Sequence, residues 1–219
     1  MIDGSMDHMS RILRQIYESI LVGDHTLVRD QVRQALAESL DPETILNEGM
    51  IAAMKEVGER FEDGSCYIPD MLIAARAMQA GLEVLKPALV FAKVKPLGKV
   101  VVGTIKGDIH DIGKNLVCMM LEGAGFEVID LGVDVAPEEY LAAIREHNPD
   151  LVGISALLTT TMQNMKTAVE AIHATAQDRR VKVIVGGAPV TEDFARRIGA
   201  DGYATDANKA VNLAKTLIQ

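Results

Sequence analysis

The chain has 219 residues, a formal net charge of −9 at pH 7 and 48% hydrophobic residues. This acidic balance, without any block of Lys and Arg, argues against a nucleic-acid partner, and no apolar run is long enough to cross a membrane. Cys66 and Cys118 lie far apart and form neither a disulfide framework nor a zinc-ligand pattern. This cysteine usage and the lack of a signal peptide favour a location in the reducing cytoplasm.

The first part of the chain, residues 10–91, has helical periodicity throughout and predicts a bundle of four helices. The predicted helices span residues 10–23, 24–40, 41–64 and 68–89. Gly23 is a C-terminal stop, Asp24 is a predicted N-cap, and Pro42 follows Asp41 at a first helical position. The last helix carries apolar residues at helical spacing: Met71, Leu72, Ala75, Met78, Leu82 and Leu85.

A short basic segment, Lys93–Gly98, separates two different sequence patterns. Its Pro96 and Gly98 would interrupt any continuous helix. The predicted organisation is therefore a helical bundle over residues 1–92, a hinge over 93–98 and a second domain over 99–219.

In the second domain, short apolar runs alternate with helical patterns. The predicted strands are Lys99–Thr104, Phe126–Leu131, Leu151–Ser155, Val181–Val185 and Gly202–Ala204. The predicted helices are Gly113–Ala124, Pro137–His147, Thr161–Ala176, Thr191–Ile198 and Asp206–Leu217. Strands that are apolar almost throughout, each followed by a helix, predict an α/β fold with a doubly wound, five-stranded parallel sheet of the Rossmann or flavodoxin-like type.

Three unusual stretches follow predicted strands of this sheet. They are "GDIHDIG" at 107–113, "SALLTTT" at 155–161 and "GGAP" at 186–189. Open parallel sheets bind ligands outside the carboxyl ends of their strands, so we expect these loops to converge. The first loop has neither a G-x-G-x-x-G nucleotide motif nor a phosphate loop, since Gly113-Lys114-Asn115 lacks the final Ser or Thr.

The pair Asp108-x-His110 indicates a metal ligand. A carboxylate two residues before an imidazole can accept its Nδ1–H, which leaves Nε2 free to bind a metal. A single histidine cannot complete a zinc site, so the metal would have to arrive with most of its ligands, as in a macrocycle. The alternative is an ordinary surface histidine on a loop.

The three motifs, Asp108-x-His110-x-x-Gly113, Ser155-x-Leu157 and Gly186-Gly187, together resemble the signature of cobalamin-binding domains. Those domains hold the cofactor base-off, with histidine as the lower axial ligand. The helical part, especially "FEDGSCYIPDMLIAARAM", is similar to the cap of methionine synthase and of corrinoid proteins from three-component methyltransferase systems. The resemblance extends from about Ser10 to Gln219.

The resemblance implies roles for individual residues. His110 would bind cobalt, and Asp108 would be its hydrogen-bond partner. Thr161 would extend this chain of hydrogen bonds towards solvent. Ser155 and Leu157 would line the slot for the displaced nucleotide tail. Further implied contacts with the corrinoid are Ile109, Gly113, Thr159, Gly186, Gly187, Tyr203 and Ala204. For Gly186-Gly187 the expected reason is that a Cβ would fill the path of the tail, and the alternative is a tight turn.

On the upper face of the cofactor, the resemblance implies an apolar shelter for the cobalt-bound methyl group. Tyr67, Ile68, Met71 and Leu72 occupy the corresponding segment of the cap. For Met71 and Leu72, packing inside the helical bundle is an equal alternative.

The implied function is a corrinoid methyl carrier. A substrate-specific methyltransferase would place a methyl group on cobalt(I) of cobalamin or a related corrinoid. A second methyltransferase would pass it from the methylcobalamin form to a folate or a thiol, and a reductive activase would be a further partner. The chain lacks barrels for substrate and acceptor, so it would complete no reaction alone.

Two other functions are compatible with a cobalamin-binding domain. A cobalamin-dependent sensor or regulator would carry a DNA-binding module ahead of the cap, whereas fewer than ten residues precede the bundle here. The small subunit of a coenzyme-dependent isomerase would lack the cap. The sequence leaves the methyl donor open among methanol, methylamines, quaternary amines and aryl methyl ethers.

Overall fold

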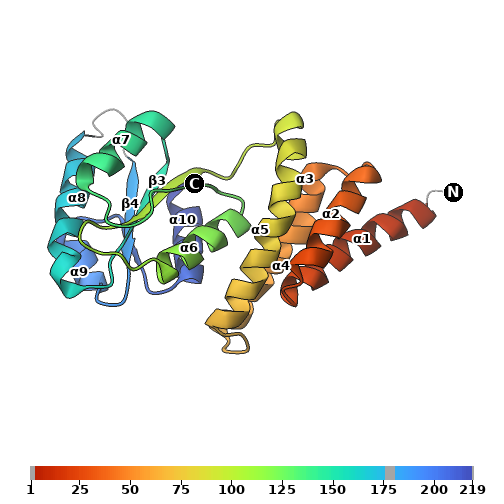
Figure 1. The fold of residues 1–219 in the computed structure, drawn as a ribbon, viewed down its shortest axis with the longest axis horizontal. Helices are drawn as coiled ribbons and strands as arrows, with labels where there is room; N and C mark the ends of the chain where they lie inside the picture. The colour runs from red at the N-terminus through yellow and green to blue at the C-terminus, as the bar shows by residue number, and fades with distance from the viewer. Residues whose placement is uncertain (1–2, 176–180, 219) are drawn as a thin grey trace. The chain divides into compact units, whose positions relative to one another are not determined.

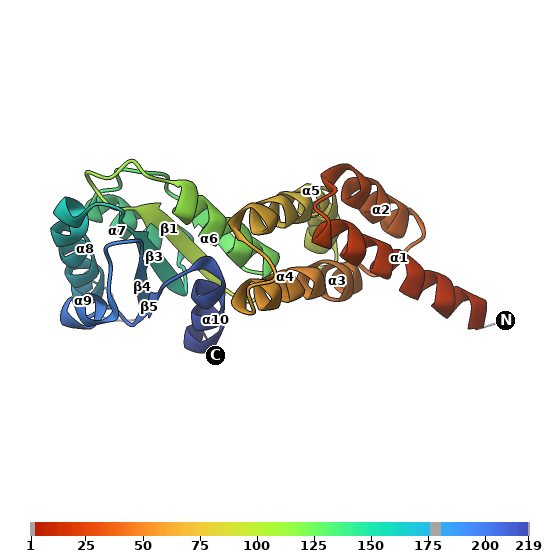
Figure 2. The ribbon, with the colours of Figure 1, turned by 90° about the horizontal axis from the view of Figure 1, so that it is seen from below.

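Two compact units make up the protein in a computed structural model that describes residues 3–175 and 181–218 (Figures 1 and 2). One unit extends to Lys95 and includes Glu122–Gly125. The other comprises Pro96–Leu121 and the chain from Phe126 onward. In the part of the chain that the structure describes, no helix combines the length and the apolar character that a membrane span requires.

The first unit is the predicted helical bundle. Its elements are α1 (Asp3–Leu21), α2 (His25–Ala37), α3 (Pro42–Thr44), the π-helix η1 (Ile45–Ile51), α4 (Ala52–Glu62) and α5 (Ile68–Phe91). Elements α3, η1 and α4 follow one another without a break and correspond to the third predicted helix. Fully buried apolar side chains from all four predicted helices form the core, among them Ile16, Val28, Met50, Met71, Met78 and Leu85. Their burial removes apolar surface from water, which is the main force that holds such a bundle together.

The predicted helix signals in the bundle are confirmed. The carboxylate of Asp24 accepts hydrogen bonds from the N–H groups of Thr26 and Leu27 at 3.1 and 3.0 Å. Asp41 accepts one from Thr44 at 2.9 Å. These contacts satisfy N–H groups that have no partner within the helix, which is why Asp favours such positions.

The π-helical segment η1 was not predicted from the sequence. Ile45 and Met50 are five residues apart, and both are fully buried. An ordinary α-helix would turn one of them away from the core, whereas the wider π turn, with bonds between residues five apart, keeps both on the buried side.

The second unit contains a parallel sheet of five strands in the order β2-β1-β3-β4-β5. The strands are β1 (Lys99–Thr104), β2 (Glu127–Asp130), β3 (Leu151–Ser155), β4 (Lys182–Gly186) and β5 (Gly202–Ala204). This is the order of flavodoxin-like folds, and it confirms the predicted fold class.

Helices cover both faces of this sheet (Figure 1). They are α6 (Ile112–Gly123), α7 (Pro137–His147), α8 (Met162–Thr175), which follows the short 3₁₀ turn η2 (Thr159–Thr161), α9 (Glu192–Arg197) and α10 (Ala207–Ile218). Side chains of α7, α8 and α9 form a core with β1, β3 and β4, and α6 and α10 lie on the other face. The predicted end of the helix that contains α8, at Ala176, lies outside the described residues.

The strand register aligns the ends of four strands. Thr104 pairs with Ser155, Ser155 with Gly186, and Gly186 with Ala204. We call this row the carboxyl edge of the sheet. The three motif-bearing loops begin at this edge, as the predicted topology requires.

Candidate functional site

The loop that follows β1, Ile105–Asp111, carries the predicted metal ligand, and we call it the histidine loop. It begins with a tight turn, in which the N–H of Asp108 donates to the carbonyl of Ile105 at 3.0 Å. Gly107, the third residue of this turn, has a φ of +86°. Such a turn favours glycine at that position because other residues rarely adopt positive φ.

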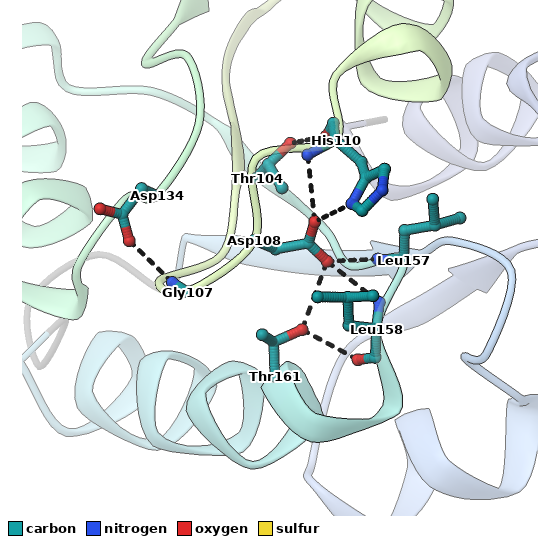
Figure 3. A network of polar contacts seen from close by, with 8 residues as sticks. All are labelled: Thr104, Gly107, Asp108, His110, Asp134, Leu157, Leu158 and Thr161. Atoms are coloured by element: carbon teal, nitrogen blue, oxygen red, sulfur yellow. Dashed lines mark hydrogen bonds and ion pairs between the residues drawn. The ribbon is translucent and has the colours of Figure 1, made fainter.

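Asp108 and His110 meet as the sequence predicts (Figure 3). The Asp108 side chain is fully buried, and its Oδ1 lies 2.7 Å from Nδ1 of His110 and 3.1 Å from the main-chain nitrogen of His110. The imidazole itself is 48% exposed. Because Nδ1 is engaged by the carboxylate, Nε2 is the ring nitrogen that can accept an external metal.

The second oxygen of Asp108 binds a different loop. Oδ2 accepts the main-chain N–H groups of Leu157 and Leu158 at 2.6 and 3.1 Å, and lies 3.3 Å from Oγ1 of Thr161 (Figure 3). The Thr161 hydroxyl is closer to the carbonyl oxygen of Leu158, at 2.9 Å. One hydroxyl hydrogen serves one acceptor best, so the bond from Thr161 to Asp108 is the weaker of the two.

These contacts fix the charge of Asp108. Burial raises the pKa of its carboxyl group, but the hydrogen bonds from Leu157, His110 and Leu158 outweigh burial and lower the pKa to about 2. The carboxylate is therefore ionised at neutral pH, and the hydrogen shared with His110 belongs to Nδ1. The pair is arranged to present the lone pair of Nε2 outward.

The surroundings of His110 suit a broad apolar ligand. Ile109 and Ile112 are 75% and 74% exposed, and Leu157 is also exposed. Among the described residues, no group of three or more His, Cys, Asp or Glu side chains could hold a metal ion. A single free imidazole nitrogen within apolar side chains fits a metal that brings its own equatorial ligands, which is the case for a corrinoid.

The other predicted contacts divide into two groups. Ser155, Gly186 and Ala204 share the aligned row at the carboxyl edge. In contrast, the ring of Tyr203 packs against the core that α7, α8 and α9 form, and Thr159 is exposed in the turn η2.

The structure gives the glycine pair a reason that the sequence did not reveal. A Cβ on Gly187 would overlap the carbonyl oxygen of Ala156, and its φ is +118°. A Cβ on Gly186 would lie 2.9 Å from the carbonyl oxygen of Ala204. The protein's own backbone therefore requires glycine at both positions, whether or not a nucleotide tail passes there.

The predicted cap residues lie in the helical unit. Tyr67 and Ile68 are exposed at the start of α5, and Leu72 is partly buried. Met71 is fully buried in the bundle. Its side chain packs in the core, which was the alternative interpretation of this residue.

Sequence reasoning missed two residues that hold the histidine loop, and an ion pair between α6 and β2. Thr104 binds the carbonyl of His110, and Asp134 binds the N–H of Gly107. Nζ of Lys114, a buried lysine in α6, contacts the carboxylate of Asp130 at the end of β2. The position of Lys114 in the motif "GKN" is the one available signal in the sequence, and by itself it indicates only an incomplete phosphate loop.

Two family models match this chain. A B12 binding domain matches residues 98–212, and a second model of the same description matches residues 12–86. Trimethylamine corrinoid protein 2 of Methanosarcina acetivorans is 44% identical over 95% of this chain and 97% of its own length. The dimethylamine corrinoid protein of Methanosarcina barkeri is 43% identical over 94% of this chain and 97% of its own.

Solved structures of cobalamin-binding proteins are also similar to this chain. A chain of the methanol:cobalamin methyltransferase complex MtaBC from Methanosarcina barkeri aligns with a TM-score of 0.82 and 30% identity, over 95% of this chain and 80% of that one. A cobalamin-binding protein from Desulfitobacterium hafniense aligns with a TM-score of 0.76 and 33% identity, over 94% of this chain and 98% of that one. The similarity thus covers both units.

Proposed function

Because the chain belongs to the B12-binding corrinoid proteins of methyltransferase systems, we propose that it carries a methyl group from a substrate-specific methyltransferase to a second methyltransferase. Its cofactor is cobalamin or a related corrinoid. The observation that carries the proposal is the buried, ionised Asp108, which engages Nδ1 of His110 and leaves Nε2 free at the carboxyl edge.

His110 binds the cobalt of the corrinoid through Nε2 in this proposal. When bound, the corrinoid supplies a cobalt centre that accepts and releases a methyl group. Asp108 holds the imidazole in one tautomer and one orientation, and the N–H groups of Leu157 and Leu158 keep Asp108 ionised. Thr161, which lies 3.3 Å from Asp108, connects this pair to the start of α8.

The remaining predicted contacts complete the cofactor site. Ser155 and Leu157 line the slot for the nucleotide tail, with Gly186 and Gly187 beside it. Ile109 and Gly113 contact the corrin, and the structure leaves open space where a Cβ on Gly113 would lie. Thr159 and Ala204 are the remaining proposed contacts, together with the main chain of Tyr203, whose ring packs against the core.

The names of the similar proteins support a particular methyl donor. Relatives at 43–44% identity are called trimethylamine and dimethylamine corrinoid proteins. We infer that the first partner is a methylamine-specific methyltransferase. The second partner transfers the methyl group to a folate or a thiol, and a reductive activase restores the cofactor to its reduced state.

The proposal also assigns a role to each part of the chain. Residues 1–92 form a cap, residues 93–98 a hinge and residues 99–219 the cobalamin-binding domain. The segment between α5 and β1 has neither helix nor strand, which supports a hinge there. The exposed side chains of Tyr67 and Ile68 are available for the cap function.

Reconstitution tests the carrier function. The protein is loaded with cobalamin, reduced, and mixed in turn with methyltransferases specific for trimethylamine, dimethylamine and methanol, each with its substrate. We expect stoichiometric methylation of the bound corrinoid with a methylamine enzyme, read from the visible spectrum, and slow methylation with the methanol enzyme. Methylation by the methanol enzyme alone would refute the proposed donor, and methylation by none of the three would count against the carrier function.

A further inference from the structure

We propose that Thr104 and Asp134 are positioning residues that hold the histidine loop, so that the His110 ring is prearranged for its ligand. This inference rests on the proposed function, because it takes His110 to be the cobalt ligand. Neither residue touches the imidazole. Both bind the main chain of the loop that carries it (Figure 3).

Asp134 holds the first half of the loop. It lies between β2 and α7, and its main-chain N–H donates to the carbonyl of Asp108 at 2.9 Å. Its Oδ1 accepts the N–H of Gly107 at 2.7 Å, and its Oδ2 lies 3.3 Å from Nζ of Lys106. One residue thus binds the turn through a donor and an acceptor at the same time.

The backbone conformation of Asp134 explains why this residue type is present. Its φ is +57°, in the left-handed region that most side chains avoid. Asp and Asn tolerate this region better than other residues, and only Asp adds a charged acceptor for the N–H of Gly107. The position therefore combines an unusual backbone conformation with a specific contact.

Thr104 holds the second half of the loop. It is the last residue of β1 and is fully buried, and its hydroxyl donates to the carbonyl oxygen of His110 at 2.9 Å. Its own N–H donates to the carbonyl of Gly132 at 3.0 Å. Thr104 thereby ties the main chain of the ligand residue directly to the central sheet.

The two contacts complement the anchor that Asp108 provides. Asp108 fixes the ring through Nδ1, while Thr104 and Asp134 fix the main chain on either side of it. A metal ligand must be held to within about 0.5 Å and 10–20° of its productive position. Without these contacts the loop would adopt other conformations. The conformation in which His110 can bind cobalt would then be less populated.

A simple stabilising role is the competing explanation, and the chain offers a matched control for it. Asp150 makes a similar pair of contacts, one through its main chain and one through its carboxylate, at the opposite end of β1. Its N–H donates to the carbonyl of Lys99 at 2.8 Å, and its Oδ2 accepts the N–H of Lys99 at 2.9 Å. Removal of the Asp150 carboxylate should affect stability without affecting cobalt ligation.

The test uses two pairs of variants. Asp134→Gly removes the carboxylate without strain at positive φ, and Asp134→Asn keeps an acceptor oxygen. Thr104→Val removes the hydroxyl at similar volume, and Thr104→Ser keeps it. Asp150→Ala is the control. Each full-length protein is loaded with cobalamin. Electron paramagnetic resonance of the cobalt(II) form then gives the ratio of protein with His110 bound to cobalt (His-on) to protein without this bond (His-off).

We expect Asp134→Gly and Thr104→Val to lower this ratio about fivefold each, the effect of one hydrogen bond of ordinary net strength. Asp134→Asn and Thr104→Ser should stay close to wild type, and Asp150→Ala should leave the ratio unchanged. If Asp134→Gly reduces thermal stability as Asp150→Ala does but keeps the wild-type ratio, Asp134 is merely structural and the inference is wrong for it. A wild-type ratio in Thr104→Val, or in Thr104→Ala if the valine variant does not fold, refutes the inference for Thr104.

Amide hydrogen exchange in the cofactor-free protein separates this inference from the proposed function. The N–H of Gly107 should exchange about fivefold faster in Asp134→Gly than in wild type, whatever the cobalt ligand is. If wild-type protein shows no protein nitrogen on cobalt, the ligand assignment fails. If the exchange rate of Gly107 is unchanged in Asp134→Gly, the positioning contact itself is refuted.

Discussion

Replacement of Asp108 by asparagine is the sharpest perturbation that the site offers, because its carboxylate is surrounded by hydrogen-bond donors. Oδ1 faces two nitrogens of His110, and Oδ2 faces the N–H groups of Leu157 and Leu158. An asparagine side chain has one oxygen and one NH₂ group, so the NH₂ group must face donors on one side. Facing His110, it would favour the tautomer with hydrogen on Nε2. Facing Leu157 and Leu158, it would leave N–H groups unpaired.

The structure gives the size of the effect. Depression of the Asp108 pKa from 3.8 to about 2 corresponds to about 2 kcal/mol of folding free energy at neutral pH. The folded-state pKa is the lower one, so this contribution is present above about pH 4 and is lost as the pH falls towards 2. Asparagine does not titrate. The difference between wild type and Asp108→Asn should therefore be largest near neutral pH and should narrow in acid.

Urea unfolding of the cofactor-free protein at neutral pH and at about pH 3 measures this difference. In the corrinoid-loaded protein, Asp108→Asn should weaken His-on ligation about 10- to 100-fold. Asp111→Asn is the control, because Asp111 is on the same loop but is exposed and accepts a hydrogen bond from the Asn115 side chain. Equal stability of wild type and Asp108→Asn at neutral pH, or a difference that does not depend on pH, would refute the reasoning.

Three further predictions concern other parts of the chain. Burial raises the pKa of Tyr140, and its hydroxyl has no hydrogen-bond partner among the described residues. In thermal unfolding, Tyr140→Phe should therefore keep or raise the free energy of unfolding, by up to about 1 kcal/mol, and a clear loss would reveal a bound water. Gly187→Ala should lower the free energy of unfolding by more than about 2 kcal/mol, because the new Cβ overlaps backbone atoms. Gly113→Ala, where the space is open, should change it by less than about 1 kcal/mol, and equal losses at the two glycines would contradict this account. Limited proteolysis should cut at Lys93 or Lys95 faster once the partner methyltransferase is added, and an unchanged rate would argue against a hinge there.

Much of the fold was predictable because its signals are local. The predicted limits of β1, β3, β5 and α7 coincide with the observed ones, since short apolar runs, Pro137 and flanking polar residues define them. The convergence of the three loops followed from parallel topology alone. The contact between Asp108 and His110 was predictable because it is local. Two residues of separation suffice for a carboxylate to reach Nδ1.

The rest of the site depends on contacts between main-chain groups that are distant in sequence. The N–H of Leu158 binds Asp108 across 50 positions, and Asp134 binds Gly107 across 27. A main-chain donor leaves no trace in the sequence, so the side chain alone does not indicate its partner. The same reason explains Gly187, whose requirement comes from the Ala156 carbonyl on a neighbouring strand end.

The central claim is that Nε2 of His110 binds cobalt of a base-off corrinoid, and isotope labelling tests it most directly. The protein is prepared with ¹⁵N-histidine, loaded with cobalamin and reduced to cobalt(II) for electron paramagnetic resonance. We predict that the nitrogen splitting changes from a triplet to a doublet on labelling. We also predict that it is lost in His110→Ala and kept in His147→Ala, which removes another partly exposed histidine of the same unit. A triplet that persists with labelled histidine, or a nitrogen signal that survives in His110→Ala, would contradict the account.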